Sequence, residues 1–144
     1  GYKDAIKTTN LSTLIFVTNQ GKMYHVPVSS VIEAGSIKIA TLIKDSSPVV
    51  FFDDLERVKL NKYWMFATES GMVKKSNIEE YNYHGRNGGK MLKLRENDKV
   101  IKCGVFTSNC ESFAVPRGNS VITVNTDIVK PTTKTAMGSK IFKE

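Results

Sequence analysis

A glycine-rich basic segment, residues 85–90, is the clearest candidate for chemistry in this chain. It reads Gly-Arg-Asn-Gly-Gly-Lys, so the cations Arg86 and Lys90 flank a flexible backbone. Its glycines are Gly85, Gly88 and Gly89. Glycines let backbone amides approach a phosphate closely, and the two cations supply the opposite charge. The segment predicts contact with a polyanion. The alternative is a glycine-rich loop between strands whose cations face only solvent.

The same segment lacks the spacing of a nucleotide-binding phosphate loop. Such a loop needs four residues between its glycines and a Ser or Thr after its lysine. Here three residues separate Gly85 from Gly89, and Met91 follows Lys90. We therefore expect no nucleotide cofactor at this segment.

Other reactive residue types do not form a catalytic or metal-binding pattern. The histidines and cysteines have no recognised zinc-ligand spacing; they are His25, His84, Cys103 and Cys110. We interpret the cysteines as small apolar residues on facing strands of a hairpin, and His25 as structural. His84 stands beside the basic segment and could assist phosphate binding. The acidic pairs at 53–54 and 79–80 are interpreted as solvated turn or cap residues. We expect no catalytic residue, metal or cofactor.

Further cations recur along the chain. Lys74 and Lys75 are adjacent, and neighbouring side chains on a strand point to opposite faces. Only one of them can therefore track the backbone of a bound polyanion, while the other covers the opposite face. The remaining candidate residues for binding a polyanion are Lys22, Lys93, Arg117, Lys130, Lys134 and Lys140. Any single one of these cations could simply face solvent. Their recurrence at equivalent positions of an internal repeat, described below, favours a shared rim that binds a polyanion.

The overall charge supports a polyanionic partner. The chain has 144 residues, with 21 Lys and Arg against 14 Asp and Glu, giving a formal net charge of +7. Such an excess favours nucleic acid as partner, although a basic protein without one is the alternative. The longest apolar run, 63–67, is far shorter than the roughly 20 residues that span a bilayer, so we expect no membrane association. Two cysteines are too few for a disulfide scaffold and suit a cytoplasmic location.

An internal repeat must position these residues. Phe16, Phe66 and Phe113 align, and so do three glycines, with spacings of 50 and then 47 residues in both columns. The glycines are Gly21, Gly71 and Gly118. Each unit reads as an apolar strand, a turn ending in glycine, and a second strand. Four strands in about 48 residues is the size of a propeller blade.

The repeat predicts one domain over 1–144, with approximate units 12–60, 61–107 and 108–144. Short helical stretches are expected at 29–34, 77–81 and 125–129. Third strands are expected at 35–40, 88–94 and 138–142, and fourth strands at 48–52 and 98–103. Because the third unit stops where its last strand should begin, the chain is expected to be part of a longer array or an open arc.

Residues 66–81, followed by 85–90 and 94–98, resemble the repeat of the C-terminal domain of the bacterial DNA gyrase and topoisomerase IV A subunit. The stretch 66–81 reads Phe-Ala-Thr-Glu-Ser-Gly-Met-Val-Lys-Lys-Ser-Asn-Ile-Glu-Glu-Tyr. The first and third units fit the pattern less tightly. The resemblance implies an all-β fold, a β-pinwheel of propeller-like, four-stranded antiparallel blades that exchange strands. About three blades are expected here, against five or six in most members.

The resemblance also implies a function. A basic outer rim would bend and wrap double-stranded DNA beside the cleavage core, and the partners would be the B subunit and the rest of the A subunit. The segment 85–90 is similar to the family's glutamine-arginine-glycine-glycine box but incomplete. Tyr83 and His84 stand where Gln and a basic residue are expected, and Met91 replaces the final Gly. This departure argues against gyrase-type introduction of negative supercoils, and it fits a topoisomerase IV-like or phage-type subunit, or a blade without the box, equally well.

The sequence therefore favours a non-catalytic DNA-binding and DNA-bending module that contacts duplex phosphates. A propeller-like module for protein–protein interaction, with no nucleic-acid role, is the alternative. An RNA-binding β-barrel is a third hypothesis. It would require exposed aromatic residues for base stacking, whereas the aromatics here fall on the repeating core columns.

Overall fold

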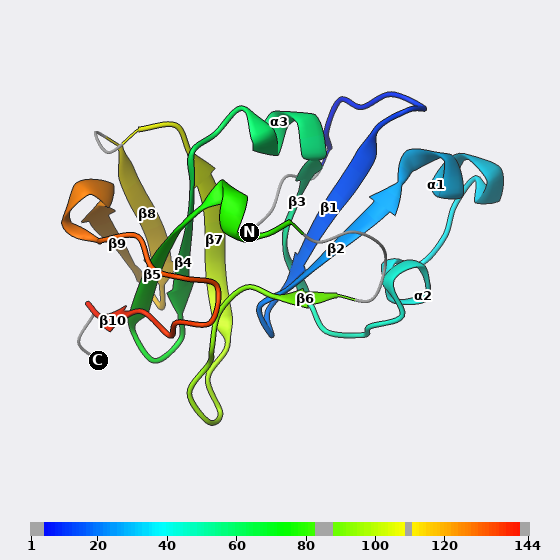
Figure 1. Ribbon diagram of the computed structural model, residues 1–144. Coiled ribbons are helices and arrows are strands. Elements are labelled where there is room, and N and C mark those ends of the chain that lie inside the picture. Colours follow the sequence, from blue (N-terminus) through cyan, green and yellow to red (C-terminus); the bar gives the residue numbers. More distant parts are fainter. Residues whose placement is uncertain (1–4, 83–87, 109–110, 142–144) are drawn as a thin grey trace.

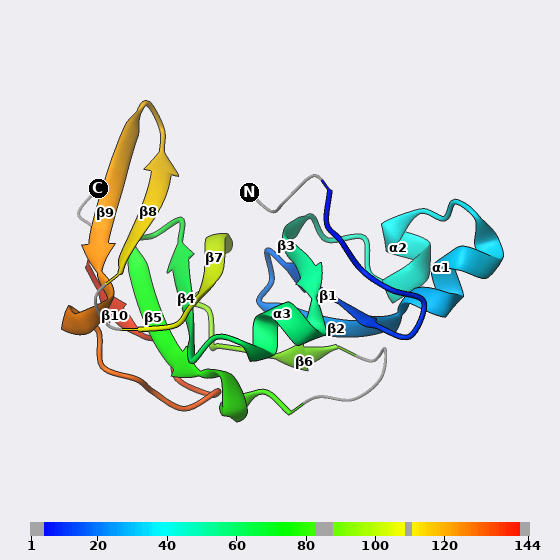
Figure 2. The same cartoon turned by 90° about the horizontal axis from the view of Figure 1, so that it is seen from above.

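Three antiparallel sheets stand side by side in the computed structural model, which describes residues 5–82, 88–108 and 111–141 (Figure 1). Within this part of the chain, two sheets have four strands and one has two. Seen from above, the sheets follow one another in chain order, with the helices α1 and α2 beyond the first sheet (Figure 2). No helix among these residues is long and apolar enough to cross a membrane.

The first sheet takes three strands from the first repeat and one from the second. Its order is β3-β1-β2-β6. The strands are β1 (Thr13–Thr18), β2 (Lys22–Pro27), β3 (Val49–Asp54) and β6 (Gly89–Lys90). The β1–β2 turn needs its glycine, because Gly21 has a φ of +72°. The blade is thus completed by a strand from the following unit, as the resemblance implied.

The second sheet repeats this exchange. Its order is β10-β5-β4-β7. The strands are β4 (Tyr63–Thr68), β5 (Met72–Asn77), β7 (Val100–Phe106) and β10 (Ser139–Lys140). Lys140 pairs with Met72 at the start of β5, as Lys90 pairs with Lys22 at the start of β2. The third sheet is the hairpin of β8 (Ser112–Arg117) and β9 (Ser120–Asn125).

One expected strand of the first unit is wrong. Residues 35–40 do not form a strand, and the helix α2 (Ile39–Ile43) begins there instead. Leu42 and Ile43 of this helix are buried in a cluster with strand residues of the first sheet. The place beside β2 is taken by β6, which comes from the second repeat.

The three short helical stretches are confirmed. They are α1 (Val28–Ala34) and the 3-10 helices η1 (Ile78–Glu80) and η2 (Thr126–Ile128). A further helix, α3 (Leu55–Lys59), was not expected, and Asp54 caps it by accepting a hydrogen bond from the Glu56 amide at 2.8 Å. The cap interpretation is therefore right for Asp54. Its solvated character is wrong, since Asp53 and Asp54 are both buried.

Two of the three core clusters lie between sheets, and the third joins the first sheet to α1 and α2. Strand β4 is buried along its whole length, because its alternate side chains enter two different clusters. Trp64 and Phe66 pack toward the first sheet, while Met65 and Ala67 pack toward the third. The Trp64 ring lies 4.9 Å from that of Phe51 on β3, centroid to centroid. Trp64 is thus a core residue.

Candidate nucleic-acid interface

A basic cleft of about 780 Å³ lies where β6 runs beside β2. Four lysines from three repeats line it: Lys22, Lys90, Lys93 and Lys134. All four were expected to contact a polyanion. Gln20 and Thr135 also line the cleft and were not expected; the only signal for Gln20 was its place in the turn before Gly21.

Strand pairing places the first two lysines. Lys22 and Lys90 are directly opposite each other in the β2–β6 register, so their side chains lie on the same face of the sheet. Lys90 is exposed and Lys22 is half-buried. The two ammonium groups therefore present their charge on one surface.

The other two lysines come from connecting segments that cross the cleft. The amide of Lys93 donates a 3.1 Å hydrogen bond to the carbonyl of Ala136, which joins the segment after β6 to residues of the third repeat. The amide of Lys134 donates a 3.1 Å hydrogen bond to a carboxylate oxygen of Glu80. Both lysine side chains are exposed.

Two carboxylates moderate the positive charge of this surface. Asp45 lies beside Lys22, and Glu80 lies beside Lys134. The Tyr24 hydroxyl donates a hydrogen bond to Asp45, and this bond outweighs the effect of burial and lowers the pKa of the carboxyl. In turn, burial and the neighbouring carboxylate raise the pKa of Tyr24 to about 12. Asp45 is thus ionised at neutral pH and Tyr24 is protonated.

The glycines that the structure describes in this segment have a packing role. Gly88 has a φ of +71°, and a Cβ atom there would lie 2.6 Å from a carbon of the Tyr24 ring. Gly88 therefore allows the chain to pass over Tyr24 and enter β6. Gly89 pairs with Met23 in the sheet. Contact between their amides and phosphate stays a prediction.

Some predicted residues lie outside the described part of the chain. These are Gly85 and Arg86 of the basic segment, with His84, and also Cys110. Cys103 is described and lies on β7, where burial raises the pKa of its thiol far above the usual range. Among the described residues, no group of three or more His, Cys, Asp or Glu could hold a metal ion.

The expectation that Lys74 or Lys75 points into solvent is wrong. Their relative exposures are 1% and 2%, so neither ammonium can track a bound polyanion. Each is held by a backbone carbonyl, of Met91 for Lys74 and of Thr126 for Lys75. The expectation that they point to opposite faces is right, because they lie opposite Phe66 and Met65, which enter different core clusters.

The remaining cations lie on or near the second and third sheets. Lys140 on β10 is exposed, and its pairing makes it the counterpart of Lys90. Arg117 is half-buried and donates a 3.2 Å hydrogen bond to the carbonyl of Glu69, in the β4–β5 turn. Lys130 is exposed. Lys140 thus gives the second sheet a cation at the position equivalent to Lys90, whereas Arg117 joins the second and third sheets.

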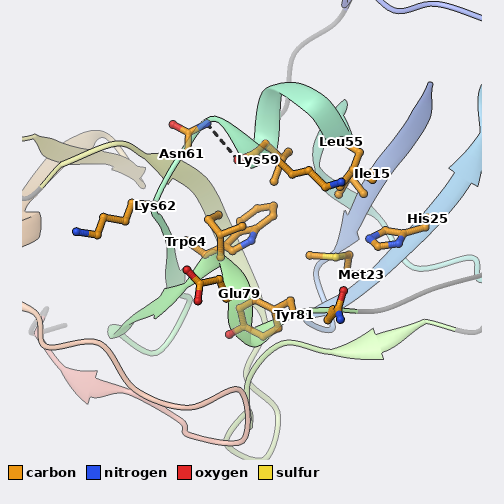
Figure 3. Close-up of a pocket in the computed structure, with 13 residues that line it drawn as sticks. Ile15, Met23, His25, Leu55, Lys59, Asn61, Lys62, Trp64, Glu79 and Tyr81 are labelled. Atoms are coloured by element: carbon orange, nitrogen blue, oxygen red, sulfur yellow. Dashed lines mark hydrogen bonds between the residues drawn. The ribbon is translucent and has the colours of Figure 1, made fainter. Parts of the chain in front are cut away.

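A second hollow, of about 490 Å³, lies between the first two sheets and α3 (Figure 3). Trp64 stands in its centre, with Met23 and Tyr81 beside it, and the Lys62 ammonium points away from the indole (Figure 3). Its walls are mostly apolar, and its charged side chains, Lys59 and Glu79 among them, have opposite signs. This hollow therefore does not have the chemistry of a polyanion site.

Comparison with known proteins places the chain near one group of sequences. The family described as "DNA gyrase C-terminal domain, beta-propeller" matches residues 12–42 and 62–107. The DNA gyrase A subunit of Lawsonia intracellularis is 32% identical over 126 residues, which cover 78% of this chain and 15% of that protein. Its counterpart from Streptococcus pyogenes serotype M1 is 29% identical over 106 residues, covering 69% of this chain and 13% of that protein. The chain therefore spans a small part of the length of these relatives.

Solved structures share its fold. The C-terminal domain of a DNA topoisomerase IV superposes with a TM-score of 0.77 at 21% identity, covering 96% of this chain and 46% of that one. The E. coli ParC C-terminal domain gives a TM-score of 0.66 at 16% identity, covering 99% of this chain and 58% of that one. Together with the exchanged strands, these likenesses confirm the predicted β-pinwheel architecture.

Proposed function

Because this chain belongs to the DNA gyrase C-terminal β-propeller domain family, we propose that it binds and bends duplex DNA as a non-catalytic accessory module of a type II topoisomerase. The contacts are made to phosphates through the basic cleft and the rim that continues it. Such contacts carry little sequence information, so binding depends on charge and shape more than on base sequence.

The observation that carries this proposal is the convergence of lysines from three repeats on one surface. Lys22, Lys90, Lys93 and Lys134 line a single cleft, so four like charges are gathered there. Asp45 and Glu80 offset part of this charge, and the lysines still outnumber these carboxylates at the cleft, which favours an anionic partner. Duplex DNA offers a regular row of phosphates to such a cleft.

Bending follows from the repetition of this surface on the next sheet. Lys90 and Lys140 occupy equivalent positions on the exchanged strands of successive sheets, β6 and β10 (Figure 2). A duplex that contacts both sheets gains phosphate contacts by curving along the array. The deformation costs on the order of several kcal/mol, which the added contacts offset.

In this proposal, the catalytic steps of the topoisomerase reaction take place outside this chain. DNA cleavage, metal binding and ATP hydrolysis belong to the B subunit and to the rest of the A subunit, which are the protein partners. The location is cytoplasmic. Contact between DNA and Gly85 and Arg86 stays a prediction from the sequence.

A binding titration at two salt concentrations tests it. A duplex of about 40 base pairs should bind, and four phosphate contacts predict a slope of log K against log salt of about −3.5. A flat salt response would contradict phosphate binding. Equal or tighter binding of a single strand of the same length would favour the RNA-binding hypothesis. Absence of DNA retention at moderate salt would favour the protein-interaction module.

A further inference from the structure

Two adjacent lysines on β5 are buried, because both faces of this strand are covered. Lys74 and Lys75 are 1% and 2% exposed. Burying an ammonium group costs several kcal/mol unless hydrogen bonds and other interactions compensate. A buried cation on a short central strand therefore calls for a reason beyond packing, which an apolar side chain would provide at lower cost.

Lys74 is held against the segment that follows the exchanged strand β6. Its Nζ atom donates a 2.7 Å hydrogen bond to the carbonyl oxygen of Met91, and the Tyr81 hydroxyl donates to the same oxygen. The ammonium also lies 6.0 Å from the Phe66 ring centroid and 5.8 Å from that of Tyr81. These contacts offset part of the cost of burying the charge.

Met91 directly follows the cleft lysine Lys90 and lies two residues before the cleft lysine Lys93. Its amide donates a 2.8 Å hydrogen bond to Gly21 of the first sheet, while its carbonyl accepts from Lys74 and Tyr81 of the second repeat. The peptide groups on both sides of Met91 are thus fixed to different sheets. Any shift of the Met91 carbonyl moves the backbone that carries Lys90 and Lys93.

Lys75 makes the equivalent contact on the opposite face of β5. Its Nζ atom donates a 2.9 Å hydrogen bond to the carbonyl oxygen of Thr126, after β9, and lies 4.3 Å from the Tyr63 ring centroid. Lys75 therefore joins the second sheet to the third repeat. It matches Lys74 in residue type, strand and burial, but its carbonyl partner does not flank the cleft lysines of β6.

We propose that Lys74 is a positioning residue for the DNA-binding cleft, whose buried ammonium fixes the Met91 carbonyl and thereby sets where Lys90 and Lys93 present their charges. This inference rests on the DNA-binding function proposed above. Lys74 touches no DNA itself. Its effect on binding passes through the backbone at Met91.

The test compares Lys74→Met with Lys75→Met in the whole chain, because methionine keeps much of the apolar length and removes the charge. Duplex affinity is measured across a salt series, and backbone hydrogen exchange is measured at the amides of Met91 and Lys93. Lys74→Met should weaken duplex binding about tenfold and reduce the salt slope by about one to two contacts. It should also speed exchange at both amides. Lys75→Met should change binding less than about twofold, with faster exchange confined to residues near Thr126.

Equal losses of binding in the two variants would overturn the proposal, since both would then report general destabilisation. An unchanged salt slope in Lys74→Met would do the same. If Lys74→Met does not fold, Tyr81→Phe removes the second hydrogen bond to Met91 and leaves the cation in place. It should weaken binding about threefold, whereas Tyr63→Phe, beside Lys75, should not.

The proposed function and this inference fail in different ways. If the unmodified chain does not bind duplex DNA, the proposed function is wrong. The exchange rates at Met91 and Lys93 still report whether Lys74 fixes this backbone. If the unmodified chain binds DNA and both variants keep the full affinity, the inference alone is wrong.

Discussion

Lys22 on β2 and Lys90 on β6 lie directly opposite each other, although they come from different repeats. Two like charges in this position repel each other, and cross-strand pairs contribute roughly 0.2–1 kcal/mol in either direction. The Asp45 carboxylate beside Lys22 offsets part of this repulsion. The pair still places two cations from different repeats on one face of the sheet.

Replacement of Lys90 should therefore affect binding more than stability. We expect Lys90→Gln to change the free energy of unfolding at low salt by less than about 1 kcal/mol. The same change should weaken duplex binding and reduce the salt slope by about one. Urea unfolding and a salt series of binding titrations measure the two effects. The control is Lys59→Gln, on α3 beyond the opposite end of the first sheet, which should leave binding unchanged (Figure 1). Equal binding losses in both variants would contradict a localised site.

The exchanged strand β10 depends on a glycine that has no room for a side chain. Gly138 has a φ of +95°, and a Cβ atom there would lie 2.4 Å from the carbonyl oxygen of Val73. Gly118 has a φ of +60° but has no atom within 4 Å of the same position. Gly118→Ala should cost about 1 kcal/mol from backbone strain alone, and Gly138→Ala about 2 kcal/mol more from the clash. Thermal and urea unfolding compare them, and equal losses would show that β10 is not held in this register.

Acid should weaken the β4–β5 turn through Asp98. Burial tends to raise the pKa of this carboxyl, but hydrogen bonds from Ser70, Thr68 and the Lys99 amide outweigh it and lower the pKa. The stabilisation is therefore complete above the unfolded value of about 3.9 and is lost as pH falls through the lower folded value. Asp98→Asn should cost about 1–2 kcal/mol at pH 7. Unfolding curves of the two proteins should converge below pH 4, and a constant difference would contradict this assignment.

Alkali should act in the opposite direction through Lys74. Burial lowers the pKa of its ammonium from 10.5 to about 8, although the charge of Glu80 partly opposes the shift. Between these values the unfolded chain holds a proton that the folded chain has released, so the free energy of unfolding rises with pH in this window. Lys74→Met should lack this rise. The difference between wild type and variant, followed by urea unfolding from pH 7.5 to 10, isolates the effect, and parallel curves would exclude it.

The local pattern of each repeat was predictable because it depends on neighbouring residues. Gly21, Gly71 and Gly118 all have positive φ in the turns where the alignment places them. The short helices after the second strands are also local. Side-chain alternation explains why Lys74 and Lys75 point to opposite faces.

The remaining features depend on contacts between repeats, which spacing does not reveal. The partner of β2 is β6, from the next unit, and this pairing brings Lys90 to Lys22. Each cleft lysine was a candidate by itself, but their convergence depends on the exchange. Burial of Lys74 and Lys75 was missed because charge suggests exposure. Their acceptors, the carbonyls of Met91 and Thr126, are backbone atoms. Every residue has a backbone carbonyl, so the residue types in the sequence do not indicate these contacts.

The exchange of strands also sets an order of events during synthesis. The first three strands of the first sheet end at Asp54, but its fourth strand begins at Gly89. A nascent chain therefore emerges with the edge of β2 open until the second repeat has been made. An open edge can pair with other chains, so this interval is when the nascent chain is most prone to aggregate. Slow translation between these two points would lengthen the exposure.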